Sequence, residues 1–138
     1  MASMAMTVSE RETFLAGVHV GIISITAPEA NRAPIAVPTW YDFDPTVGVW
    51  VLTGPSSRKG LALRAAGRFT LTAQTEDSSC LYVSVEGPVI EERVATKAGD
   101  LVPMARRYNG QEGGDAYAAA FPDKPGNVGS VYIMRPKR

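Results

Sequence analysis

Short strand-like segments, separated by turn residues, run through most of this chain and constrain its fold more than any other feature. The segments are residues 18–25, 33–43, 47–53, 68–75, 80–92 and 128–135. Segments 18–25 and 128–135 are rich in residues that favour strands. In the other four, successive side chains alternate between two faces with the period of two of a β-strand. Helices do not alternate with the segments one by one, so a parallel sheet is not favoured. The pattern predicts one domain over residues 1–138, a mainly β fold built as a small antiparallel β-barrel with short helices.

Two stretches have helical character outside the predicted barrel. Ser9 and Glu12 have the spacing of a capping box, which predicts a short helix that ends before Gly17. Residues 94–120 read as a second helical stretch, interrupted at Pro103 because proline lacks the amide that a helix interior requires. We therefore expect an N-terminal helix and a helical excursion before the last strand.

Proline and glycine give two of the strand segments a particular position. Pro34 and Pro38 remove two hydrogen-bond donors from segment 33–43, which predicts an edge strand or a bulged one. Gly87 and Pro88 interrupt the longest segment and predict a bend or bulge there, as at the corner of a barrel.

Composition excludes several classes of function. Lys and Arg together number 14, and Asp and Glu also number 14, so no overall charge favours binding to nucleic acid or to an anionic membrane. No window is apolar over the length that a bilayer requires. The single cysteine, Cys80, rules out an internal disulfide and is expected to be a small core residue. We expect a cytoplasmic protein that binds no nucleic acid and no membrane.

A strand, a turn and a helix start follow one another between residues 47 and 67. Segment 47–53 ends at the Gly-Pro pair 54–55, and Ser56 or Ser57 is placed to cap a helix that ends at Gly67. This unit predicts that the strand delivers the beginning of a helix to one end of the barrel.

The charges at that helix start are unusual. Arg58 and Lys59 lie in the first turn, where the helix dipole already presents partial positive charge and carboxylates are the usual choice. Backbone amides, hydroxyl groups and two cations would suit a phosphate. The spacing from Gly54 to Lys59, followed by Gly60, does not match a P-loop. A phosphate cradle and a solvated cationic turn both account for these residues.

Catalytic side chains are scarce. The chain has one histidine, His19, within an apolar strand segment, so a structural or dimer-contact role is favoured over general-base catalysis. The carboxylates lie mostly at turns and strand ends, where solvated charges are ordinary. A bound cofactor would then carry the reactivity. Trp40 and Tyr41 are candidates to flank a planar ring, with core aromatic residues as the alternative.

Four short motifs occur in order along the chain. They are Pro38-Thr-Trp-Tyr41, Trp50-Val-Leu-Thr53, Ser57-Arg-Lys59 with Leu63 and Arg64, and Val83-Ser-Val-Glu-Gly87. Their order and spacing resemble the split β-barrel superfamily of pyridoxamine 5'-phosphate oxidase-like flavin-binding proteins. The resemblance spans roughly residues 10–95, and the element Thr-x-x-x-Ser-Arg-Lys is its most specific part.

The resemblance implies a homodimer of six-stranded antiparallel split β-barrels, with two cofactor sites in clefts between the subunits. The residues that would hold the cofactor phosphate are Thr53, Ser57, Arg58 and Lys59. The residues that would lie along the isoalloxazine ring are Val37, Pro38, Thr39 and Trp40. Family members often carry asparagine where this chain has Ala62, whose methyl group cannot supply the hydrogen bonds of an amide.

Within this superfamily some branches use FMN, one uses the deazaflavin coenzyme F-420, and some relatives bind haem. The Ala, Arg and Gly content and the Pro-x-Trp-Tyr strand look more like the deazaflavin branch, which makes F-420 the expected cofactor and FMN the alternative. The resemblance then implies an oxidoreductase that passes hydride to a small conjugated substrate. An FMN-binding pyridoxamine 5'-phosphate oxidase-like protein, a cofactor carrier without turnover and a structural dimer with an empty pocket are the alternatives.

Overall fold

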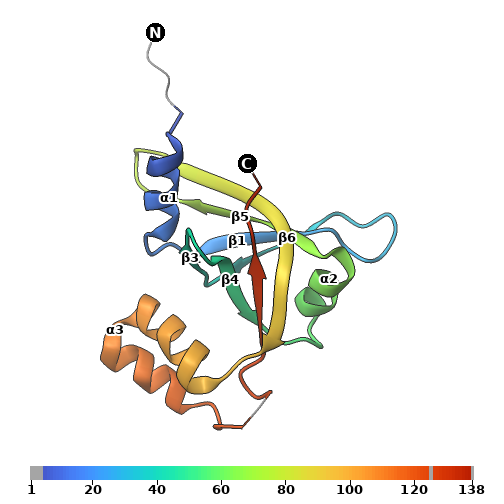
Figure 1. The fold of residues 1–138 in the computed structure, drawn as a ribbon, viewed down its shortest axis with the longest axis vertical. Helices are drawn as coiled ribbons and strands as arrows, with labels where there is room; N and C mark the ends of the chain where they lie inside the picture. The colour runs from blue at the N-terminus through green and yellow to red at the C-terminus, as the bar shows by residue number, and fades with distance from the viewer. Residues whose placement is uncertain (1–4, 125, 138) are drawn as a thin grey trace.

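The computed structural model describes residues 5–124 and 126–137. Within these residues the chain forms three α-helices, a π-helical turn and seven strands (Figure 1). The helical elements are α1 (Val8–Ala16), α2 (Arg58–Ala66), η1 (Lys97–Leu101) and α3 (Val102–Ala119). The strands are β1 (Gly21–Ile25), β2 (Ile35–Thr39), β3 (Asp42–Asp44), β4 (Gly48–Thr53), β5 (Arg68–Gln74), β6 (Tyr82–Val94) and β7 (Ser130–Met134).

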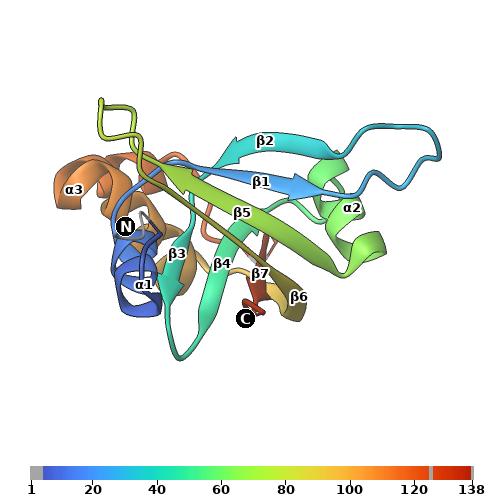
Figure 2. The same ribbon diagram turned by 90° about the horizontal axis from the view of Figure 1, so that it is seen from above.

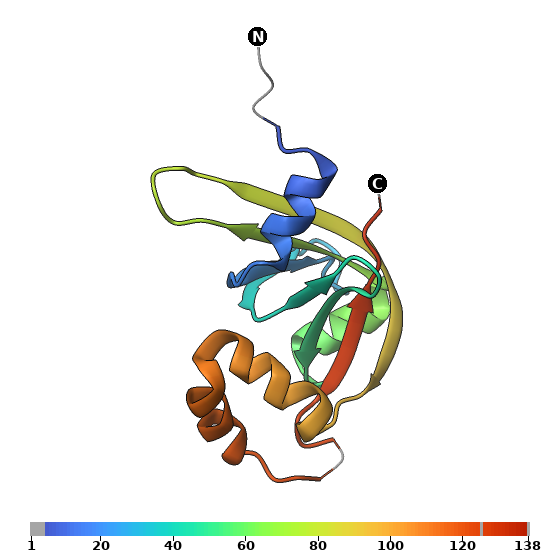
Figure 3. The same cartoon turned by 60° about the vertical axis from the view of Figure 1, so that its left-hand side comes forward.

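The strands form one antiparallel sheet in the order β2-β1-β5-β6-β7-β4-β3. Figure 3 shows how this sheet curls into a half-barrel, with α1 across one end and α3 at the other. The prediction of a mainly β, antiparallel barrel with short helices is confirmed in this form. The expectation of six strands is wrong by one, because segment 33–43 divides into β2 and β3.

The division between β2 and β3 falls at Trp40 and Tyr41. The backbone of Tyr41 is bonded to side chains here, not to a neighbouring strand. Its N–H donates to Tyr108 Oη at 3.0 Å, and its carbonyl oxygen accepts from Arg107 Nε at 3.0 Å. Side chains of α3 thus replace the strand neighbour at this point. The two halves then occupy the two edges of the sheet, so the edge position predicted from Pro34 and Pro38 is confirmed for β2.

Strand β6 joins the two halves of the sheet. Its first part pairs with β5 and its second part pairs with β7, with a register shift between Val89 and Glu91. Figure 1 shows the yellow ribbon of β6 bending as it passes from one to the other. At Gly87 an added Cβ would lie 1.9 Å from Arg135 O. The bend therefore needs a glycine, because the backbone that follows β7 passes close to β6 at this point.

The core lies inside the curl of the sheet, where the alternating positions of the strands meet α1 and α2. The expected alternation is confirmed in β5, whose inward residues are buried and whose outward residues are more exposed. β1 shows the same pattern. The largest fully buried side chains are Tyr41, Tyr132, Leu15, Ile23, Ile25, Leu63, Leu71, Met104, Met134, Val49, Val51 and Val131.

Two local expectations are wrong. Helix α1 is capped by Thr7, whose side chain accepts from Glu10 N, and not by Ser9; two overlapping capping boxes exist in the sequence, and the extended backbone at Thr7 selects the earlier one. Cys80 is exposed at a turn before β6, not buried in the core. No helix within the described ranges has the length and apolar character needed to cross a bilayer.

Candidate functional site

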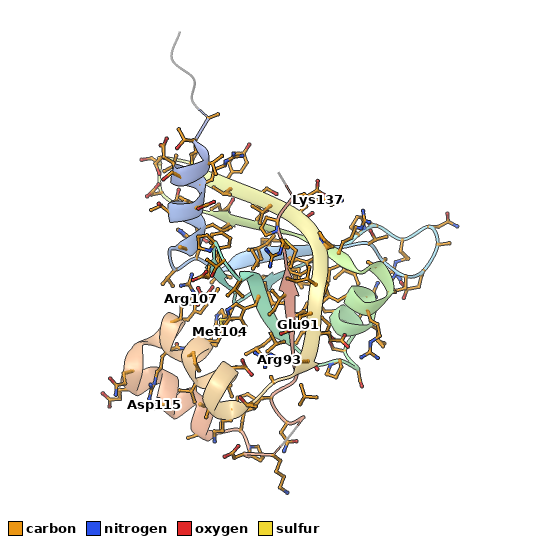
Figure 4. All side chains as sticks on the ribbon, in the orientation of Figure 1. Glu91, Arg93, Met104, Arg107, Asp115 and Lys137 are labelled. Carbon is orange, nitrogen blue, oxygen red and sulfur yellow. The ribbon has the colours of Figure 1, made fainter. Side chains whose placement is uncertain are left out.

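A cleft of about 590 Å³ opens where the end of β4 faces the helical excursion η1–α3. One wall comes from the end of β2 and the turn between β4 and α2, and the other comes from η1, α3 and the loop before β7. Figure 4 marks Met104 at the junction of α3 with the sheet. The lining residues are Val20, Pro38, Thr39, Trp40, Leu52, Thr53, Gly54, Lys59, Leu101, Met104, Tyr117, Phe121 and residues 126–129.

The turn between β4 and α2 is fixed by Ser57. Its hydroxyl accepts from Gly60 N at 3.1 Å and donates to Gly54 O at 2.6 Å, while its amide also donates to Gly54 O at 3.1 Å. Ser57 is therefore the helix cap, one of the two serines expected in that role, and Gly67 ends α2 in the left-handed conformation as predicted.

Lys59 is the only charged residue among those that line the cleft. The ammonium group is half-buried, and desolvation lowers its pKa from the ordinary value of lysine. The first turn of α2 contains no acidic residue. Across residues 5–124 and 126–137 no carboxylate forms an ion pair with Lys59. A partly desolvated cation at a helix N-terminus attracts an anion.

Arg58 points elsewhere. Its guanidinium lies 3.9 Å from a carboxylate oxygen of Glu29, in the loop between β1 and β2, and its side chain is 52% exposed. Neither residue lines the cleft. The structure thus separates the two adjacent cations of the helix start, with one directed into the cleft and the other held at the surface.

Aromatic side chains from the end of β2 and from α3 meet at the cleft. The Trp40 ring stacks on Tyr108 with centroids 5.0 Å apart and planes 9° apart. It also meets Tyr117 at 5.1 Å with an interplanar angle of 53°, and Tyr117 in turn meets Phe121 at 5.4 Å. This wall offers flat apolar surface to a ligand in the cleft.

The residues predicted for the site divide into two groups. Five of them, Pro38, Thr39, Trp40, Thr53 and Lys59, line the cleft together. The other three lie outside its lining: Val37 packs against the core, Ser57 caps α2, and Arg58 pairs with Glu29.

Sequence reasoning missed the contribution of residues 97–121. It described them only as a helical excursion, whereas η1 and α3 supply Leu101, Met104, Tyr117 and Phe121 to the cleft. The signal available was the aromatic residues of that stretch, which are uncommon in a helix exposed on all sides.

The described residues of the lining include two threonine hydroxyls and one lysine, but no histidine, cysteine or carboxylate. The described part of the chain contains no group of three or more His, Cys, Asp or Glu residues that could hold a metal ion. His19 stacks on Phe14 at 4.4 Å, and its Nε2 lies 3.1 Å from Phe14 O, in agreement with the structural role predicted for it.

No family model and no curated protein matches this chain. Solved structures share its fold at low sequence identity. An F420 reductase superimposes with a TM-score of 0.72 at 16% identity, covering 92% of this chain and 93% of that protein. The conserved hypothetical protein Rv2991 from Mycobacterium tuberculosis gives 0.72 at 20% identity, with 100% and 85% covered.

A third structure is a 5-nitroimidazole antibiotic resistance protein from Bacteroides thetaiotaomicron, with a TM-score of 0.62 at 15% identity, covering 97% of this chain and 82% of that one. At these identities the likeness shows the fold and nothing finer. The chain has the split-barrel fold of this group of proteins, as the sequence resemblance implied.

Proposed function

We propose that this protein is an oxidoreductase that binds the deazaflavin coenzyme F-420 in the cleft and passes hydride to a small conjugated substrate. The observation that carries the proposal is the pairing of one half-buried cation, Lys59, with an aromatic wall in a cleft whose described lining has no histidine, cysteine or carboxylate. A site of this kind binds and orients a reactive group but does not supply one.

The phosphate end of the site is the turn between β4 and α2. Lys59 would meet a phosphate oxygen as a charge-assisted hydrogen-bond donor, and the buried Thr53 hydroxyl lies beside it at the end of β4. Ser57 acts indirectly, because its hydroxyl is engaged in capping α2. Since Lys59 is half-buried and has no carboxylate partner among the described residues, an anion would compensate a charge that the fold leaves unpaired.

The ring end of the site is the end of β2. Pro38, Thr39 and Trp40 present apolar and backbone surface there, against which a planar ring can lie. When bound, the coenzyme supplies the hydride chemistry. The chain's own residues bind the ring, exclude water from one face of it and leave the remaining space of the cleft for substrate.

A second copy of the chain is the proposed partner. On the outer face of β2, β1, β5 and the part of β6 that pairs with β5, most side chains are small, apolar or uncharged, and charge enters at one end through Arg68 and Glu86. Figure 2 looks onto this face and shows no helix over it. Pro38 belongs both to this face and to the cleft, so a subunit docked there would border the site.

F-420 is favoured over FMN because one structural neighbour is an F420 reductase. FMN binding in the manner of pyridoxamine 5'-phosphate oxidase-like proteins is the second candidate, since both cofactors offer a planar ring and a phosphate. A haem-storage protein, HutZ from Vibrio cholerae, shares the fold with a TM-score of 0.56, but the cleft described here is lined by no histidine or cysteine to bind haem iron.

Titration of the purified protein with F-420 and, separately, with FMN tests the proposal. We expect F-420 to bind with a dissociation constant in the micromolar range, observed as a change in cofactor fluorescence. Failure of both cofactors to bind would overturn the oxidoreductase assignment. Steady-state oxidation of reduced F-420 by a quinone then separates an enzyme from a carrier, because a carrier gives at most one stoichiometric event.

A further inference from the structure

The last turn of α1 and the break between β2 and β3 are both held by Arg107 of α3. Its Nε donates to Tyr41 O at 3.0 Å, and one terminal nitrogen donates to Ala16 O at 3.1 Å and to Gly17 O at 2.7 Å. The other terminal nitrogen lies 3.0 Å from Asp42 Oδ1. The end of a helix and a break in a strand both leave backbone carbonyl groups without partners. Arg107 donates hydrogen bonds to carbonyl groups at both places. Figure 4 shows Arg107 where α3 comes close to α1 and β3.

Tyr108, the next residue, holds the same break from the other side. Its hydroxyl accepts from Tyr41 N at 3.0 Å and donates to His19 O at 2.6 Å. Burial raises the pKa of Tyr108, so the hydroxyl keeps the proton that it donates. The Tyr108 ring is parallel to the Trp40 ring, within 9°.

Trp40 therefore has an unusual support. In a regular strand the N–H and C=O of the next residue, Tyr41, would bond to an adjacent strand. Here both groups bond to side chains of α3. The indole also lies on the Tyr108 ring and lines the cleft. The orientation of the aromatic wall thus depends on two consecutive residues about 70 positions further along the chain.

We propose that Tyr108 and Arg107 are positioning residues that fix Trp40 in the cleft, and that ring binding requires Trp40 to be fixed in this way. The claim about Trp40 stands on the contacts above, whereas the claim about ring binding rests on the proposed function. The two parts are therefore tested separately, one of them without any ligand.

Trp40 can be observed alone, because the chain has two tryptophans and Trp50→Phe removes the other. In that background Tyr108→Leu removes ring and hydroxyl, Tyr108→Phe removes the hydroxyl only, and Arg107→Lys keeps the charge but loses the planar fork. Leu61→Ala is the control, since Leu61 is 54% exposed on α2 and does not line the cleft.

The first measurement is acrylamide quenching of Trp40 fluorescence in the ligand-free protein, with circular dichroism to confirm folding. We expect the quenching constant to rise about twofold in Tyr108→Leu, less in Tyr108→Phe and Arg107→Lys, and not at all in Leu61→Ala, because a released indole becomes accessible. If Tyr108→Leu does not fold, the two milder variants decide. Quenching unchanged in every folded variant would overturn the proposal.

The second measurement is the affinity of the same variants for F-420 and FMN. We expect Tyr108→Phe to weaken binding by about fivefold, the effect of losing one net hydrogen bond that holds the wall. Greater quenching with affinity equal to that of the parent would overturn the claim about ring binding. Greater quenching in a protein whose parent binds neither cofactor would uphold the positioning of Trp40 and overturn the proposed function instead.

Discussion

Arg58 and Lys59 are adjacent in sequence, but their surroundings give them different roles. The Lys59 side chain enters the cleft and has a lowered pKa because of burial. The Arg58 side chain lies at the surface beside Glu29, at a separation of 3.9 Å that contributes little to stability. A cationic helix start therefore contains one group suited to binding a buried anion and one that is solvated.

Lys59→Ala is expected to weaken F-420 binding by about 1.5–3 kcal/mol, the range for a hydrogen bond to a charged group. Arg58→Ala, the matched control in the same helix turn, is expected to change it by less than about 0.5 kcal/mol. Fluorescence titration of both variants measures the difference. Equal losses would contradict the separation of the two side chains.

Because the pKa of Lys59 is lowered, the affinity for F-420 is expected to depend on pH. A phosphate binds the protonated ammonium, and the protonated fraction falls as pH rises through the lowered pKa. Affinity for F-420 is therefore expected to decrease in the parent protein as pH rises, and to do so at a pH below the ordinary pKa of lysine. Lys59→Met has no titrating group at this position, so its weaker affinity should not show this loss.

At the scale of elements, the start of α2 depends on close contact with the turn before it. An added Cβ at Gly60 would lie 2.2 Å from Gly54 O and 2.9 Å from Pro55 Cα, both of them backbone atoms that cannot move aside alone. The glycine thus allows α2 to begin directly over the turn, which places Lys59 at the cleft.

Gly60→Ala is expected to destabilise the protein by about 1–3 kcal/mol, because overpacking against backbone forces α2 to shift. Gly54→Ala provides the control, since a Cβ there meets nothing nearer than 3.9 Å. Thermal unfolding of both variants measures the effect. Equal midpoints in the two variants would show that α2 does not require this contact.

The excursion η1–α3 is anchored at its base as well as through Arg107 and Tyr108. Asp100 is buried and accepts from both terminal nitrogens of Arg93 at 2.8 Å, which lowers the pKa of that carboxyl. Lys97 Nζ donates to Phe121 O at 2.8 Å and ties the two ends of the excursion together. Hydrogen bonds at the base and at the cleft thus hold α3 as one wall of the site.

At the scale of the whole molecule, one sheet has two faces with different roles. The inner face packs the core against α1 and α2, and the outer face of β2, β1, β5 and the part of β6 that pairs with β5 is nearly uncharged. An uncharged sheet face of this extent is typical of a surface that another subunit covers.

Ile22→Glu is expected to convert the proposed dimer to a monomer, because it places a charge at the centre of the uncharged face, between Pro38 and Thr72. Leu61→Glu, on the exposed side of α2, is the control and should leave the assembly unchanged. Light scattering after size-exclusion chromatography measures the mass. A monomeric parent protein would contradict the proposed partner.

The sequence by itself determined the features that depend on neighbouring residues. Alternation fixed which side of β5 faces the core, a serine at 56 or 57 and Gly67 bounded α2, and Pro38 marked an edge strand. It also placed Trp40 and Lys59 at a common site, through a resemblance whose motifs are local. Propensity, capping and strand period act within a few residues, so they can be recognised along the chain.

Only the tertiary structure decided the features that depend on distant residues. The break at Tyr41 arises from hydrogen bonds to Arg107 and Tyr108, which are 66 and 67 positions away. Until α3 is docked, nothing near Tyr41 distinguishes a broken strand from a continuous one, because unpaired backbone groups are satisfied by whichever donor or acceptor the fold brings close. For the same reason only the fold shows that α3 builds one wall of the cleft and that Arg58 lies outside it.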